Sequence, residues 1–311
     1  MGFRKSASRG SYTDVMVRYY ERTWFDYRFV WVSNRNYFGM HWGYWDENTK
    51  SHNESLVNMN RAVGAFAGLE PGMRVLDAGC GVGGPSMWIA ETYGVNVVGV
   101  TLSAVQVERA QNNARRRHLE DCVQFAQEDF TDLTFPNESF DVVWSQEAVC
   151  HSRPEDKQKF LTEAHRVLRP GGRLVVEDWF RRGRAYSERD ERLLKEMLWG
   201  LAIEDLATGE EFAGWAAAAG FREVGLHDIT AHALPSMRRL RKLALACYPP
   251  GLFLRALQIR SAVEHGNLRA AMLQWPAQKR DLWFMAILAA RKEDLADQQQ
   301  TPPPELNRTR S

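Results

Sequence analysis

The feature that most constrains this fold is a glycine-rich stretch, Val75-Leu-Asp-Ala-Gly-Cys-Gly-Val-Gly-Gly84. An apolar run ends at Asp77, and glycines follow at positions 79, 81, 83 and 84. Glycine adopts positive φ and lets the backbone approach a ligand without a Cβ in the way. The stretch therefore predicts a buried parallel strand that turns sharply into a helix beside a ligand. A Gly-x-Gly-x-Gly turn alone is shared by many nucleotide-binding domains.

The spacing Asp-x-Gly-x-Gly-x-Gly, with Asp77 inside the turn, resembles motif I of the class I S-adenosylmethionine (SAM) methyltransferases. In that family the turn holds the amino-acid end of SAM. The resemblance implies a Rossmann-like α/β fold with a seven-stranded sheet of order 3-2-1-4-5-7-6, a helical cap, and SAM as cofactor. Its candidate cofactor contacts are Asp77, Gly79, Gly81 and Gly83. The alternative is a structural strand–turn–helix that binds no ligand.

Apolar runs and helical spacing alternate along the chain, as in a doubly wound sheet. We expect strands at 75–78, 95–101, 123–127, 140–145, 173–178, 221–230 and 283–290. We expect helices at 50–68, 85–92, 104–117 and 155–167. Ser51 is placed to cap the first of these helices, with Glu54 three residues on. Pro170-Gly-Gly172 is expected to turn into the fifth strand.

Four regions lie outside this core or extend it. Residues 1–11 and 294–311 are expected to form a disordered leader and tail, since both are polar. Residues 12–50 are expected to form an aromatic helical segment: from Tyr19 to Trp45, twelve of 27 residues are aromatic, against 11% of the chain. Within the SAM-binding domain at 51–293, insertions at about 181–219 and 232–280 are expected to complete the cap. Core packing or an oligomer interface is the alternative for the aromatics.

Composition bounds the location and the partners. The net charge is +1, which gives no global attraction to nucleic acid or to an anionic membrane. No apolar run is long enough to span a bilayer. Four widely spaced cysteines without paired metal spacing indicate a reduced, cytoplasmic protein, and no metal site is expected.

The family pattern implies further cofactor contacts at the second and third strands. Thr101 stands where an acidic residue normally meets the ribose. The phrase Gly-Val-Thr-Leu-Ser-x-x-Gln, ending at Gln106, resembles the cyclopropane fatty-acid synthase branch, in which threonine and glutamine take over part of that role. The resemblance assigns the remaining contacts to Leu102, Asp129, Phe130 and Ser145. From its local sequence alone, Asp129 is a solvated loop acid.

The end of the fourth strand borders the ligand crevice of such a sheet. Here Glu147-Ala-Val-Cys-His-Ser-Arg153 resembles the Glu-Ala-Thr-Cys-His-Ala-Pro of sterol C-methyltransferases. Gly43-Tyr-Trp45 is similar to a phrase of the tocopherol-pathway enzymes. The resemblance covers roughly residues 37–180 and implies methylation of an isoprenoid carbon.

Alkene methylation needs no initial base, because the π bond attacks the sulfonium methyl and leaves a carbocation. Aromatic ring faces stabilise such a cation, and a carboxylate accepts its proton. We expect Glu147 as base, with His151 as its partner or alternative and Tyr20 beside them. The expected substrate contacts are Trp24, Tyr44, Trp45 and Trp179. The alternatives are a SAM contact or a helix-terminal acid for Glu147, and a packing role for His151.

Two basic clusters are candidates for a prenyl diphosphate, and solvated faces are the alternative: Arg181, Arg182 and Arg184; Arg238, Arg239, Arg241 and Lys242. Magnesium is expected only with a diphosphate, and the chain has no Asp-Asp-x-x-Asp motif. An uncharged prenylated or sterol-like substrate is equally open.

The leading hypothesis is a SAM-dependent C-methyltransferase of isoprenoid or terpenoid molecules in specialised metabolism, with cyclisation as an optional further step. The alternatives are an N- or O-methyltransferase of a small amine, phenol or quinol, a cyclopropane synthase, and a non-catalytic SAM-binding protein. The expected partners are a hydrophobic small molecule and further copies of the chain, without nucleic acid.

Overall fold

The computed structural model describes residues 9–31 and 38–294. Residues 1–8 of the expected leader and 295–311 of the expected tail lie outside the described residues. Helix α1 (Arg9–Asp26) begins three residues before the expected boundary at residue 12. It continues into a short π-helix at Tyr27–Trp31.

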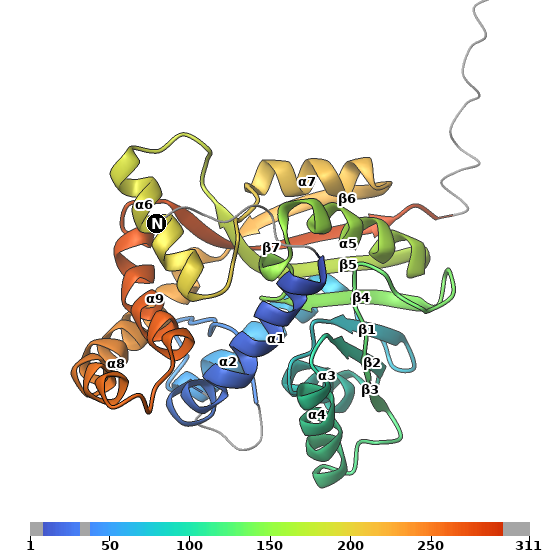
Figure 1. The fold of residues 1–311 in the computed structure, drawn as a ribbon. Coiled ribbons are helices and arrows are strands. Elements are labelled where there is room, and N and C mark those ends of the chain that lie inside the picture. Colours follow the sequence, from blue (N-terminus) through green and yellow to red (C-terminus); the bar gives the residue numbers. More distant parts are fainter. Residues whose placement is uncertain (1–8, 32–37, 295–311) are drawn as a thin grey trace, which may run out of the picture.

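Seven strands form one sheet in the order β3-β2-β1-β4-β5-β7-β6, which confirms the expected topology (Figure 1). Their bounds are β1 Arg74–Ala78, β2 Asn96–Thr101, β3 Val123–Gln127, β4 Phe140–Gln146, β5 Leu168–Arg181, β6 Phe221–Asp228 and β7 Trp283–Lys292. Strands β1 to β5 are parallel, and β7 runs antiparallel to β5 and β6. The carboxyl ends of β1 to β5 therefore meet along one edge, where ligands of such sheets bind.

The remaining helices are α2 His52–Ala67, α3 Gly84–Tyr93, α4 Ala104–Arg116, α5 Pro154–Val167, α6 Glu188–Gly200, α7 Gly209–Ala218, α8 Thr230–Ala256 and α9 Ala262–Gln278. A 3₁₀ turn at Val149–His151 follows β4. The predicted cap of α2 is confirmed, because the Ser51 side chain accepts a hydrogen bond from the Glu54 N–H. That bond satisfies one of the unpaired N–H groups of the first turn.

Alternation along the strands divides the core between the two faces of the sheet. Val75 faces a cluster that includes Met59 and Val63 of α2, whereas its neighbour Leu76 faces a cluster that includes Phe160 of α5 and Phe212 of α7. Successive strand residues point to opposite faces, so an apolar strand is buried on both sides. The sheet is thus a rigid platform for the residues at its edge.

The expected turn at Pro170-Gly-Gly172 lies inside β5, which is a correction to its expected start at residue 173. Leu168 pairs with Phe140 and Arg173 pairs with Val142, so β5 carries extra residues at this point. A Cβ on Gly172 would lie 2.8 Å from the Arg169 carbonyl oxygen. The sequence signalled a break in regular structure, and the strand absorbs it as a bulge.

Helices α1, α6, α8 and α9 form the cap. Helix α9 packs against the other three, and Figure 1 shows it between α6 and α8. Helix α7 instead packs on β6 and against α5, and it buries Phe212 and Ala216 on the sheet. The insertion expected at 181–219 therefore contributes α6 to the cap, while α7 belongs to the sheet layer.

Candidate active site

A cavity of about 430 Å³ lies between the carboxyl edge of the sheet and the cap. Its lining includes most of the site residues expected from the sequence: Tyr20, Asp77, Gly79, Gly81, Thr101, Leu102, Gln106, Asp129, Phe130, Glu147, His151 and Trp179. The fold thus brings the expected cofactor contacts and the expected catalytic residues into one space. They come from α1, from the ends of β1 to β5 and the turns that follow them, and, for Gln106, from the first turn of α4.

The turn after β1 forms one end of this cavity. Asp77 is buried, it accepts a hydrogen bond from the Ser86 hydroxyl, and burial raises its pKa to about 7. Gly79 and Gly81 have φ of +91° and +54°. A Cβ on Gly79 would lie 2.2 Å from the Ala148 Cβ, whereas a Cβ on Gly81 would have only the Met40 sulfur, at 3.8 Å, among its close neighbours. The Gly81 backbone is therefore open to the cavity.

The ends of β2 and β3 add polar groups to the same wall. The Thr101 hydroxyl donates to Gln106 Oε1 at 2.6 Å, so the expected threonine–glutamine pair is held together. Asp129 Oδ1 accepts from the backbone N–H and the hydroxyl of Thr131, at 2.9 and 2.7 Å. These bonds fix the Asp129 carboxylate at the cavity wall, next to the Phe130 ring.

Glu147 lies at the centre of the cavity wall, directly after β4. Its carboxylate accepts hydrogen bonds from the Trp42 backbone N–H and, at 3.0 Å, from Trp179 Nε1. Burial raises its pKa to about 8, although both hydrogen bonds oppose that rise. Its φ of +46° is unusual for a residue other than glycine, and such strain clusters at functional sites.

His151 is paired with Tyr20. The Tyr20 hydroxyl lies 2.8 Å from His151 Nε2, and the Tyr12 hydroxyl donates to the His151 carbonyl oxygen at 2.8 Å. Burial lowers the pKa of His151 to about 3, so its ring is neutral at physiological pH. An imidazole of such low basicity orients the Tyr20 hydroxyl better than it takes up a proton.

Several expected site residues lie outside the cavity lining. Gly83 packs against Phe125, which a Cβ would approach to 2.5 Å, and the Ser145 hydroxyl donates to the Ala78 carbonyl oxygen at 2.8 Å. Both residues stabilise the turn after β1 without lining the cavity. The β1 and β4 positions that the family pattern selects are therefore partly structural here.

Three expected substrate contacts also lie elsewhere, which corrects their expected placement. The Trp24 ring lies under the guanidinium of Arg109 on α4. On α8, the ring of His232 stacks on Tyr44 with centroids 4.0 Å apart, and Ser236 accepts from Trp45 Nε1 at 2.8 Å. These contacts fasten the N-terminal segment to neighbouring helices, because each ring finds a polar or charged partner there.

Other aromatic residues of the same segment take their place. Tyr27, Trp31 and Trp42 line the cavity, and the Trp42 and Trp179 rings lie 6.0 Å apart. The aromatic density of the segment signalled such a role, but only the tertiary structure shows which rings face the cavity. Polar residues at the cap end of the cavity, Asp26, Arg260, Asn267 and Gln274, carry no sequence motif and were missed.

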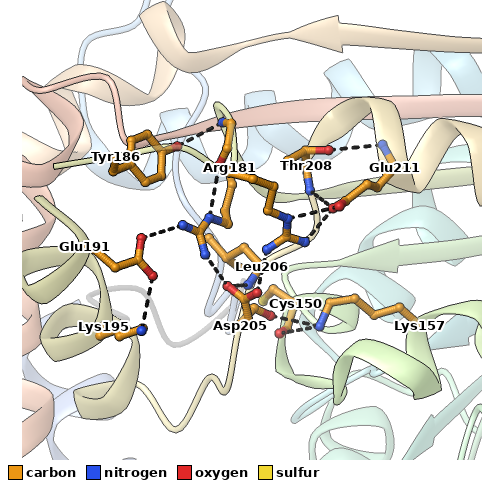
Figure 2. Close-up of polar contacts among 12 residues, drawn as sticks. Cys150, Lys157, Arg181, Tyr186, Glu191, Lys195, Asp205, Leu206, Thr208 and Glu211 are labelled. Atoms are coloured by element: carbon orange, nitrogen blue, oxygen red, sulfur yellow. Dashed lines mark hydrogen bonds and ion pairs between the residues drawn. The ribbon is translucent and has the colours of Figure 1, made fainter. Parts of the chain in front are cut away.

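The arginines after β5 are held in ion pairs and do not line the cavity. Arg181 is buried between Glu191 and Asp205, with N–O distances of 2.7 and 2.9 Å (Figure 2). Arg184 pairs with Asp205 and Glu211. In the second cluster the Arg238 guanidinium lies over the ring of Trp275 on α9. The observed partners favour structural roles for these side chains over a diphosphate clamp.

The paired contacts of the Arg181 guanidinium with Glu191 and Asp205 predict a measurable contribution to the stability of the fold. Replacing Arg181 by lysine should lower the free energy of unfolding by about 2 kcal/mol, because an ammonium cannot bond both carboxylates in the same geometry. Urea denaturation measures this change. Arg184→Lys is the matched control and should cost less than about 1 kcal/mol, since that side chain is 42% exposed. Equal costs would contradict the assigned role of Arg181.

In residues 9–31 and 38–294, no three His, Cys, Asp or Glu side chains gather as a metal ion would require. Over the same ranges, none of the helices has the length and apolarity needed to cross a membrane.

Comparisons with known proteins connect this site to a family. Residues 76–176 match the family model described as a methyltransferase domain. A 27-O-demethylrifamycin SV methyltransferase of Amycolatopsis mediterranei is 32% identical over 63% of this chain and 71% of its own length. A 2-methyl-6-phytyl-1,4-hydroquinone methyltransferase of Synechocystis is 41% identical over 47% of this chain, and a sterol 24-C-methyltransferase of Gibberella zeae 32% over 54%. The chain spans 43% and 42% of the lengths of those last two relatives.

Solved structures share the whole architecture. The [4+2]-cyclase SpnF is 27% identical, with a TM-score of 0.68 over 82% of this chain and 87% of its own. A geranyl diphosphate C-methyltransferase of Streptomyces coelicolor has a TM-score of 0.70 over 92% of this chain and 100% of its own. Its sequence is 18% identical, and the likeness is one of fold.

Proposed function

The chain belongs to the SAM-dependent methyltransferase family, and from this premise we propose that it methylates a double-bond carbon of an isoprenoid or terpenoid small molecule. One observation carries the proposal: a buried carboxyl group, Glu147, faces the same cavity as several aromatic rings and the motif I turn. Alkene methylation requires these three components together, namely a methyl donor, a shield for a cation and a proton acceptor.

The residues present fit SAM, which supplies an electrophilic methyl group on a sulfonium when bound. Asp77 offers an acidic partner to the ammonium group of the cofactor, and burial raises its pKa to about 7. The open backbone at Gly81 leaves room for the amino-acid end. Thr101, Gln106 and Asp129 provide hydrogen-bonding groups along the wall for the nucleoside.

This fit predicts a pH dependence of SAM binding. A cationic ligand favours the ionised form of Asp77 and lowers its pKa, so protons compete with SAM as the pH falls through 7. Affinity should be about tenfold weaker at about pH 6 than at about pH 7.5. Calorimetry in a Glu147→Gln background measures the affinity, because that variant removes another cavity-lining carboxyl group whose pKa is raised into this range, to about 8.

Asp77→Asn in the same background is the control for titration of the cofactor itself. It should bind SAM more weakly and without the step near pH 7. A step of the same size in the Asn variant would show that Asp77 is not the group that responds.

The chain's own residues can stabilise a substrate cation and exclude water from it. Tyr20, Tyr27, Trp42 and Trp179 present rings to the cavity, and each ring face contributes about 0.5–2 kcal/mol to a desolvated cation. Glu147 adds a negative charge when it is ionised. Its two N–H donors stabilise the anion, and a nearby cation lowers its pKa further below 8.

Glu147 is then placed to accept the proton that the cation loses. An Oε atom takes the proton from a carbon next to the cationic centre, and the C–H electron pair becomes the new double bond. The raised pKa of about 8 makes this carboxylate a stronger base than an exposed glutamate. His151 and Tyr20 line the same cavity and are held together by their hydrogen bond.

The names of the relatives support this substrate class. Two of them are named for a phytyl hydroquinone and for a sterol. The rifamycin relative supports a place in specialised metabolism. SpnF is named a [4+2]-cyclase, which supports ring formation as a reaction that this scaffold can host.

The second candidate is O-methylation of a phenol or quinol. A relative named as a probable tocopherol O-methyltransferase is 31% identical over 66% of this chain and 60% of its own length, and the rifamycin enzyme is another relative. In that reaction Glu147 would take the hydroxyl proton before methyl transfer. The aromatic rings would then pack on a flat substrate instead of facing a cation.

Methyl-labelled SAM distinguishes the two candidates. The full chain is incubated with geranyl and farnesyl diphosphates, with and without magnesium, and with a sterol, a prenylated quinol, and simple amines and phenols. Label on a carbon of one isoprenoid would support the proposal, and its skeleton would show whether cyclisation follows. Label only on oxygen or nitrogen would overturn it.

We further propose that the reaction takes place in the cytoplasm. All four cysteines are free thiols, which supports the reducing conditions of a cytoplasm. Self-association stays a prediction from the sequence, and light scattering on the purified chain tests it.

A further inference from the structure

Helix α8 and the loop after it concentrate positive charge. Residues 229–263 contain five arginines and one lysine but no aspartate or glutamate, although the whole chain has a net charge of only +1. Arg241, Lys242 and Arg255 of this segment are exposed. Figure 1 shows α8 at the edge of the cap, with α9 between it and α6.

The same segment exposes large apolar side chains. Five of the eight exposed large apolar residues in the described part of the chain lie here: Leu245, Leu252, Phe253, Leu257 and Ile259. Their exposed fractions run from 44% to 65%. Apolar side chains gathered among cations are typical of surfaces that bind a membrane interface.

The opposite face of this helix lines the cavity of the active site. The lining residues Leu243, Cys247, Pro250, Gly251 and Leu254 recur at helical spacing. Leu245 and Leu252 are seven residues apart, two helical turns, and lie on the outer side. Phe25 of α1 lines the cavity while 64% of it is exposed, and the next residue, Asp26, pairs with Arg260 at 2.6 Å, so this exposed part of the cavity wall lies beside the end of the segment.

We propose that residues 241–260 form a membrane-docking surface that binds an anionic lipid bilayer and delivers a lipophilic substrate to the cavity. The exposed apolar side chains enter the interface while Arg241, Lys242 and Arg255 meet lipid phosphates. One helix thus separates the bilayer from the active site, and a substrate has a short path between them. A symmetric contact with a second copy would place this cationic segment against itself, which is unfavourable.

Vesicle co-sedimentation of the full chain tests the proposal. The chain should sediment with vesicles of phosphatidylcholine mixed with phosphatidylglycerol and much less with phosphatidylcholine alone, and salt should weaken the binding. The double variant Leu252→Ser, Phe253→Ser should bind at least tenfold more weakly. Trp199→Ser is the matched control, because Trp199 is 62% exposed on α6, and it should bind as the unchanged chain does.

Absence of vesicle binding by the unchanged chain would overturn the proposal, as would equal binding by the double variant. Light scattering tests the other possible occupant, a second copy of the chain. If the unchanged chain does not bind vesicles and the double variant has a lower molecular mass than the unchanged chain, the surface is an interface between two copies. The assay contains neither SAM nor substrate. Its outcome is therefore independent of the reaction proposed above.

Discussion

Replacing Glu147 by glutamine should lower turnover by roughly 10²–10⁴-fold while leaving SAM affinity nearly unchanged. Glutamine keeps the size of the side chain and one of the two acceptor oxygens, since Trp42 N–H bonds Oε1 and Trp179 Nε1 bonds Oε2. It removes the negative charge that stabilises a cation and the oxygen that takes up the proton. Methyl transfer from labelled SAM measures turnover, and calorimetry measures the affinity for SAM.

Glu177→Gln is the matched control for this change. Glu177 is a buried neighbour on β5 whose pKa burial also raises well above its usual value, but it is not among the residues that line the cavity. Its variant should keep most of the turnover. Unchanged turnover in Glu147→Gln would remove Glu147 from the chemistry, and equal losses in both variants would indicate a general effect of the buried carboxyl groups.

Replacing Gly81 by alanine should weaken SAM binding about a hundredfold. The added methyl group would stand in the open space at the cavity end of the β1 turn, where the cofactor must approach the backbone. A hundredfold loss of affinity corresponds to the loss of two hydrogen bonds from backbone N–H groups to a ligand carboxylate, at about 1.5 kcal/mol each. Calorimetric titration with SAM measures the dissociation constant directly.

Gly72→Ala controls for the backbone strain that alanine suffers at positive φ. Gly72 has φ of +85° and no heavy atom within 4 Å of an added Cβ, and it is not among the cavity-lining residues. Both variants should therefore lose similar stability, while only Gly81→Ala should lose affinity. Loss of affinity in both, or in neither, would contradict the assignment of this turn to SAM.

The sequence allowed prediction of the sheet and of the cofactor end of the site because both depend on local patterns. Buried parallel strands are continuous apolar runs, and the β1 turn requires glycine at fixed positions whatever surrounds it. Glu147 and His151 followed from their place directly after a strand, since the carboxyl ends of parallel strands meet at one edge. The residues of the β5 bulge were predicted as a turn before the strand, because a Pro-Gly-Gly phrase fits a turn and a bulge equally well.

The sequence by itself determined the strand segments and the glycine-rich turn after β1, and its resemblance to the methyltransferase family supplied the strand order and the candidate positions for SAM and for Glu147. Only the tertiary structure decided which aromatic rings face the cavity and which fasten the N-terminal segment, as for Trp42 against Trp24. It also decided that Arg181 is an ion-pair partner and that α8 lines the cavity on one face and meets solvent on the other. The reason is physical: turns and strands follow from neighbours in the chain, whereas the partner of a ring or a guanidinium is fixed by helices distant in sequence.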